Sequence, residues 1–91
     1  MTTTVLKVIV PNIKGLHARA AAQIVFLSSE YPCKIKIAHK QKQVSSLSLI
    51  NLLTLDAPQG SELIITSSGE NSKLAARAIE TLILSGFGEQ G

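Results

Sequence analysis

His17 is the side chain of this sequence whose type and position best suit chemistry near neutral pH. Only His17 and His39 carry an imidazole, the group that ordinarily titrates in this range. His17 comes directly after the pair Gly15-Leu16 and directly before an unbroken Ala-rich stretch, residues 18–29. Because Ala is the strongest helix former, that stretch predicts a helix with His17 at or near its N-cap.

The start of a helix is a ready anion site, and this one places a nucleophile beside it. The first backbone amides, those of Ala18, Arg19 and Ala20, have no partner inside the helix and lie at the positive end of its dipole. Arg19 adds a permanent positive charge for charge-assisted hydrogen bonds. The dipole favours a neutral imidazole, whose lone pair can act as a nucleophile. These features predict a transient phosphohistidine at His17. The alternative is that His17 only caps the helix, although histidine is a poor cap.

No other residue suggests a second site. His39 ends a predicted strand beside a lysine-rich turn, and we expect a partly exposed strand-end histidine there. The lone Cys33 excludes an internal disulfide and a Cys-based zinc site. We therefore expect neither a metal nor a cofactor.

Size and composition predict one small soluble domain. The chain has 91 residues, 45% of them hydrophobic, and we assign residues 1–91 to a single domain. Its net charge of +3 favours acidic partners, but aromatic residues make up only 3%, which leaves little to stack on nucleic-acid bases. The N-terminal residues 1–10 resemble a strand rather than a signal peptide, and no apolar run approaches the roughly 18 residues of a membrane span. We expect a cytoplasmic monomer that binds neither nucleic acid nor membrane.

Hydrophobic periodicity gives the order of the elements. Alternation predicts strands at 4–10, 33–39, 43–46 and 62–67, the last with Leu63 and Ile65 inward. Helical spacing predicts helices at 18–29, 48–55 and from 71 or 72 to about 85. The inward face of the last helix is predicted from its spacing: Leu74, Ala75, Ala78, Ile79, Leu82 and Ile83. The order β-α-β-β-α-β-α predicts a two-layer α+β sandwich.

The motif Gly15-Leu16-His17-Ala18-Arg19-Ala20 resembles the phosphohistidine signature of the HPr family, phosphocarriers of the bacterial phosphoenolpyruvate-dependent phosphotransferase system. The segments 47–50 and 52–60 are similar to further family landmarks, so the resemblance covers roughly the whole chain. It implies an open-faced sandwich in which three helices cover a four-stranded antiparallel sheet. Residues 53–56 and 84–87 look like the nitrogen-related NPr branch, which regulates rather than imports sugar; the branch stays open.

The resemblance also implies roles for individual residues. Enzyme I would phosphorylate Nδ1 of His17, and the group would pass to a IIA protein, so the chain would be a carrier rather than an enzyme. Arg19 and the amides of Ala18 and Arg19 would hold the phosphoryl group. An apolar docking patch would lie beside it, although about half of the patch is equally well explained as core. This docking patch consists of Leu49, Ile50 and Leu53.

Two positions in the resemblance need separate interpretation. Ser48 matches the serine that HPr kinase/phosphorylase modifies in some bacteria, which would make that kinase a partner, but a helix N-cap is the preferred interpretation of Ser48. Ala20 stands where many relatives carry proline; alanine there frees one more amide, and we expect the site to survive with an altered transfer rate.

Three rival functions remain. In a regulatory or binding module of similar fold, His17 would be only a cap. An RNA-binding domain is favoured only by four lysines, which are better explained as a solvated strand face because no aromatic lies among them: Lys34, Lys36, Lys40 and Lys42. An independent enzyme has the least support, because we expect no His–carboxylate or metal cluster near His17.

Overall fold

The computed structural model describes residues 2–89, so Met1 and residues 90–91 of the predicted domain lie outside it. The strands are β1 (Thr3–Ile9), β2 (Lys34–His39), β3 (Lys42–Ser45) and β4 (Glu62–Ser68). The helices are α1 (Ala18–Ser28), α2 (Leu49–Leu53), α3 (Ser72–Leu84) and a short 3-10 turn, η1 (Gly86–Gly88). The predicted order of elements is confirmed, and α2 is shorter than the predicted 48–55.

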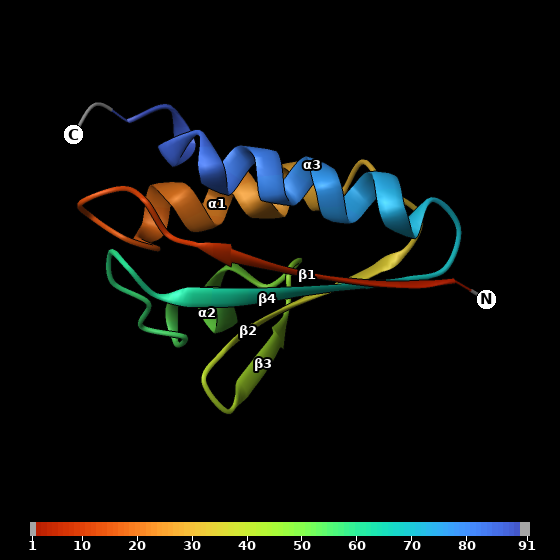
Figure 1. Ribbon diagram of the computed structural model, residues 1–91, viewed down its shortest axis with the longest axis horizontal. Coiled ribbons are helices and arrows are strands. Elements are labelled where there is room, and N and C mark those ends of the chain that lie inside the picture. The colour runs from red at the N-terminus through yellow and green to blue at the C-terminus, as the bar shows by residue number, and fades with distance from the viewer. Residues whose placement is uncertain (1, 90–91) are drawn as a thin grey trace.

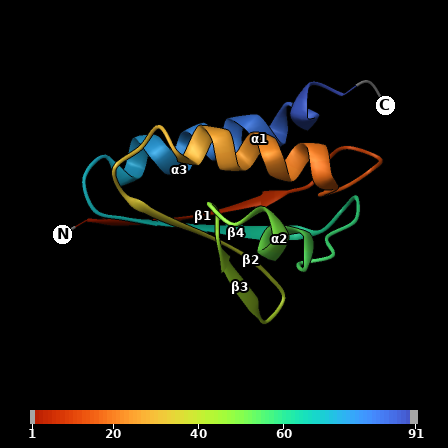
Figure 2. The same cartoon turned by 180° about the vertical axis from the view of Figure 1, so that it is seen from behind.

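The four strands form one antiparallel sheet in the order β1-β4-β2-β3. Helices α1 and α3 lie side by side over one face of this sheet (Figures 1 and 2). Helix α2 packs against α1 and β3. The predicted two-layer α+β sandwich is therefore confirmed, with the antiparallel sheet that the resemblance implied.

The core fills the space between the sheet and the helices. Alternating strand positions point into it, because successive side chains of a strand face opposite sides. Leu63 and Ile65 are fully buried there, as predicted. The other large, fully buried apolar side chains come from both layers: Val10, Ile24, Ile37, Leu52, Ile79 and Ile83. None of the described helices is both long enough and apolar enough to cross a membrane.

The predicted inward face of α3 is wrong at one position. Leu74 is 64% exposed, whereas Ala76 is fully buried. Helix α3 packs on β1 and β4 through Ala75, Ala76, Ile79 and Ile83. Successive helical residues are turned by about 100°, so a face centred on Ala75 and Ala76 leaves Leu74 outside. Small alanines bring the helix close to the sheet, and the larger side chain stays in solvent.

The loop before α1 is fixed by a close backbone contact. The Leu16 amide donates to the Ala57 carbonyl at 2.9 Å. A Cβ on Gly15 would lie 2.5 Å from that carbonyl oxygen and 2.8 Å from Cα of Pro58, and Gly15 has a φ of +66°. Only glycine fits this position, because it has no Cβ and tolerates positive φ.

We predict that Gly15→Ala lowers the free energy of unfolding by about 3 kcal/mol, the sum of left-handed strain and overpacking. Gly60→Ala is the matched control, since Gly60 has a φ of +89° but nothing within 4 Å of an added Cβ. It should cost only about 1 kcal/mol. Urea unfolding of both variants measures the difference. Equal losses would show that the loop moves away from Ala57 and Pro58 at no cost.

Candidate functional site at the start of helix α1

His17 is the N-cap of α1, as its neighbours in the sequence predicted. Its backbone is extended, with φ −89° and ψ −178°, and its carbonyl accepts from the Ala21 amide at 2.9 Å. Its side chain makes no capping hydrogen bond to the helix. Within residues 2–89, no acceptor meets the amides of Ala18, Arg19 and Ala20. The first turn of α1 thus has three unpaired N–H groups, of which those of the exposed Ala18 and Arg19 lie open beside the imidazole.

Arg19 lies in this first turn and is exposed. No ion pair to Arg19 occurs in the part of the chain that the structure describes. Ala20, the position where many relatives have proline, is completely buried. The guanidinium therefore remains available to an anion, while Ala20 faces the core.

A carboxylate contacts His17, contrary to our expectation that none would. Oε2 of Glu89 is hydrogen-bonded to Nε2 of His17, and the two side chains are 13% and 26% exposed. A carboxylate oxygen accepts, so this contact places the ring hydrogen on Nε2. In the neutral ring the lone pair then lies on Nδ1, which has no hydrogen-bond partner among residues 2–89.

Asn12 holds the other oxygen of this carboxylate. Its Nδ2 donates to Oε1 of Glu89 and to the Gly15 carbonyl, both at 2.9 Å, and Asn12 is only 3% exposed. The hydrogen bond from Asn12, and after it the one from His17, lowers the pKa of Glu89 below its ordinary value of 4.5. The positive charge of Lys14 lowers this pKa further by a smaller amount, whereas burial of the carboxyl raises it. Glu89 is therefore a carboxylate at neutral pH.

The chain after α3 is shaped to bring Glu89 to this place. Phe87 is buried although its φ is +59°, and the flanking Gly86 and Gly88 also have positive φ. The Phe87 carbonyl accepts from Nε2 of Gln23 on α1 at 3.2 Å. Figures 1 and 2 both show the C-terminal segment beside the loop that precedes α1.

The sequence analysis missed both Asn12 and Glu89. The signal available was the Gly86-Phe87-Gly88 run, in which two glycines around an aromatic residue favour a sharp turn anchored in the core. That run does not say where the turn leads. The contact between His17 and Glu89 joins residues 72 positions apart.

Helix α2 presents the predicted docking patch. Ile50 is 71% exposed, Leu49 is exposed and Leu53 is partly buried, while Leu52 of the same helix is in the core. Because α2 packs against α1, the patch belongs to the helical side of the molecule.

Ser48 is the N-cap of α2, and its Oγ accepts from the Asn51 amide at 3.3 Å. The cap interpretation of this serine is confirmed. Its phosphorylation stays a prediction.

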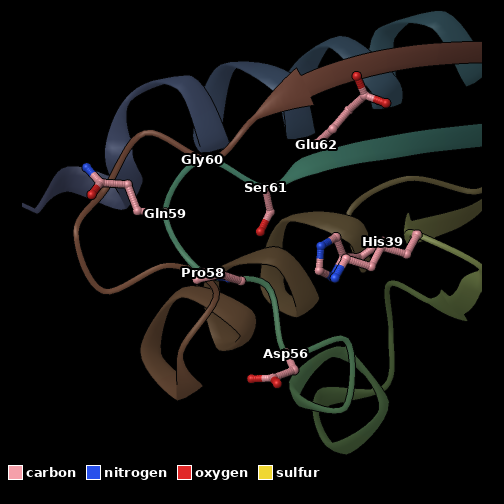
Figure 3. A pocket seen from close by; sticks show the side chains of 8 residues that line it. His39, Asp56, Pro58, Gln59, Gly60, Ser61 and Glu62 are labelled. Carbon is pink, nitrogen blue, oxygen red and sulfur yellow. The ribbon is translucent and has the colours of Figure 1, made fainter.

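His39 is buried rather than partly exposed, so that expectation was wrong. Its Nδ1 donates to the Leu55 carbonyl at 2.8 Å. The ring borders a cleft of about 640 Å³ formed with Lys40, Asp56 and residues 58–62 (Figure 3). In Figure 3 the carboxylates of Asp56 and Glu62 point away from the ring. His39 therefore has a structural hydrogen bond, and neither carboxylate of this cleft points to its ring.

Known proteins are similar to this chain in sequence and share its fold. Residues 5–85 match the family described as PTS HPr component phosphorylation site. The chain belongs to the HPr family. It is 35% identical over 81 residues to phosphocarrier protein HPr of Chlamydia pneumoniae, covering 89% of this chain and 75% of that protein. It is 34% identical to phosphocarrier protein NPr of Shewanella violacea, covering 98% of both.

A solved HPr structure shows the same fold. The crystal structure of HPr-C-His from Thermoanaerobacter tengcongensis superposes with a TM-score of 0.91 at 30% identity, covering 97% of this chain and 99% of that one. The family that the His17 motif indicated is therefore confirmed, and both HPr and NPr proteins are among its relatives.

We predict that the carboxyl carbon of Glu89 titrates in NMR with a midpoint below 4.5. Since the pKa is lowered in the folded state, the carboxylate stabilises the fold above pH 4.5, and this contribution is lost as pH falls through the lowered pKa. Asn12→Ala should raise the midpoint more than Lys14→Gln, because the Asn12 hydrogen bond is the largest cause. An unshifted midpoint in the parent protein would show that the Asn12–Glu89 contact does not persist in solution.

Proposed function

We propose that this chain is a histidine phosphocarrier that accepts a phosphoryl group on His17 from enzyme I, charged by phosphoenolpyruvate, and passes it to a IIA protein. The observation that carries this proposal is the unpartnered Nδ1 of His17 beside the free amides of Ala18 and Arg19. We further propose that residues 1–91 act as one phosphocarrier domain, as a monomer, in the bacterial cytoplasm.

The chemistry requires only exchange of one bond for another. The Nδ1 lone pair attacks phosphorus, the bond from phosphorus to its donor atom on enzyme I breaks, and that electron pair stays with the donor. The amides of Ala18 and Arg19 and the Arg19 guanidinium receive the phosphoryl oxygens. Transfer to IIA is the reverse step with a new acceptor. The chain is thus a substrate of enzyme I, not a catalyst that turns over alone.

A carrier with two successive partners needs a surface that both can use briefly. Leu49, Ile50 and Leu53 offer apolar anchors, and the net charge of +3 suits acidic partners. Transient complexes of this kind bury less than about 1,200 Å², so a few anchors dominate the affinity.

Ser48 links this docking patch to regulation. In bacteria that contain HPr kinase/phosphorylase, a phosphate on Ser48 would add negative charge next to the patch and weaken binding of acidic partners. The phosphoryl group serves either sugar transport or nitrogen-related regulation. An assay of which purified IIA protein accepts the group from this chain distinguishes the two.

We predict that His17→Ala folds normally and accepts no phosphoryl group. The reason is that it removes the proposed nucleophile from an otherwise intact helix start. His39→Ala is the matched control: it should lose about 1–3 kcal/mol of stability with its buried hydrogen bond, yet accept the group. Mass spectrometry after incubation with enzyme I and phosphoenolpyruvate gives the result. Phosphorylation of the His17→Ala variant at the parent rate would refute the assignment.

We predict that Ile50→Glu raises the Michaelis constant for the carrier in the enzyme I reaction about tenfold, as expected for an anchor of an interface. Its melting temperature should hardly change, since the side chain is exposed. Leu74→Glu makes the same change at an exposed leucine of α3, away from the docking patch, and should leave the Michaelis constant unaltered. Parent-like kinetics for Ile50→Glu would place the docking surface elsewhere.

A further inference from the structure

The contact between His17 and Glu89 raises the question of what a carboxylate does at a site meant to hold a phosphoryl group. A negative charge next to an incoming anion would be unfavourable if it lay on the same side of the ring. Here Glu89 meets Nε2, and Nδ1 is the ring atom without a partner among residues 2–89. The two nitrogens lie on different edges of the imidazole, so the carboxylate and the phosphoryl group can occupy the ring together.

The position of Glu89 is maintained by several interactions. Asn12 binds one carboxylate oxygen, His17 binds the other, and Gln23 holds the preceding Phe87 carbonyl. The left-handed backbone of Phe87, with a φ of +59°, is unfavourable for a residue with a Cβ. Such strain persists only where surrounding contacts enforce it, and it is concentrated at functional sites.

We propose that Glu89 is a positioning residue for phosphoryl acceptance. Its carboxylate keeps the hydrogen on Nε2, so that the neutral ring presents its lone pair at Nδ1. When the Nδ1–phosphorus bond forms and the donor bond breaks, Nε2 keeps its hydrogen and the ring becomes cationic. Glu89 then balances that charge through a charge-assisted hydrogen bond. This inference rests on the proposed function of His17.

Asn12 binds the carboxylate oxygen of Glu89 that does not contact His17. By donating to both Glu89 and the Gly15 carbonyl, its buried amide couples the C-terminal segment to the loop that sets the direction of His17. The series of hydrogen bonds from Asn12 through Glu89 to His17 is similar to that of other nucleophilic sites, in which a further residue orients the group that reacts.

The test uses the full-length protein and its Glu89→Gln variant, which keeps the shape of the side chain and removes its charge. A neutral hydrogen bond is weaker than a charge-assisted one, so we expect kcat for phosphorylation by enzyme I to fall about fivefold, with KM unchanged. Glu70→Gln is the charge-matched control. Glu70 is exposed and precedes α3, whereas Glu89 follows it, so the 13 residues of that helix separate the two and the Glu70 variant should behave as the parent.

Ring nitrogen NMR provides a measurement that a purely structural role would not change. In the parent, long-range ¹H–¹⁵N spectra near neutral pH should show the hydrogen on Nε2 of His17, and Glu89→Gln should move part of the population to Nδ1–H. Asn12→Ala should shift the spectra in the same direction. Combined with Glu89→Gln it should add little, because both changes break one network.

Several outcomes would overturn the proposal. These are a parent-like kcat in Glu89→Gln, a slower kcat with unchanged ring nitrogen shifts, or faster phosphorylation, which would make Glu89 an obstacle. Failure of the proposed function is a different result: parent and variant would both accept no phosphoryl group while their ring spectra still differed.

Discussion

The close approach of the Gly15 backbone to Ala57 and Pro58 is the constraint on which the rest of the site depends. It fixes the loop before α1 so that Leu16 is buried, and the chain then enters the helix at His17 in an extended conformation. If that loop were free to move, the imidazole and the helix amides would lose their fixed relation. The contact is made by backbone atoms, so side-chain rotation cannot relieve it. One glycine therefore controls the geometry of the His17 imidazole and of the first amides of α1 together.

The second group of contacts comes from the C-terminal segment. Phe87 fills a place in the core, and the residues around it turn the chain so that Glu89 meets both Asn12 and His17. These contacts orient the ring and leave the amides of Ala18 and Arg19 without a partner among residues 2–89. A site proposed to accept and then give away the same group would benefit from this division. Fixed interactions would orient the ring, while the groups proposed to hold the phosphoryl oxygens would remain reachable by partners.

Local patterns in the sequence were sufficient for the fold and for the centre of the site. Strand alternation and helical spacing arise from the backbone itself, with periods of 2 and 3.6 residues, so the order of elements could be predicted without knowing what packs on what. The site at His17 was visible for the same reason. Gly15, His17 and the first amides of α1 are neighbours in the chain, and the free donors at a helix start follow from helix geometry alone.

Tertiary structure decided everything that joins distant segments. Glu89 lies 72 residues after His17, and only the turn at Phe87 brings the two together. His39 was expected to be partly exposed, and its hydrogen bond to the Leu55 carbonyl joins two segments that no strand pattern brings together. Leu74 has the spacing of a core residue and is exposed, because the small alanines of α3 set the orientation of that helix on the sheet. The sequence by itself determined the elements and the place of His17 at a helix start, since both follow from short-range backbone geometry. The contact of Glu89 with His17 was decided only by tertiary structure, because it joins residues 72 positions apart across one core.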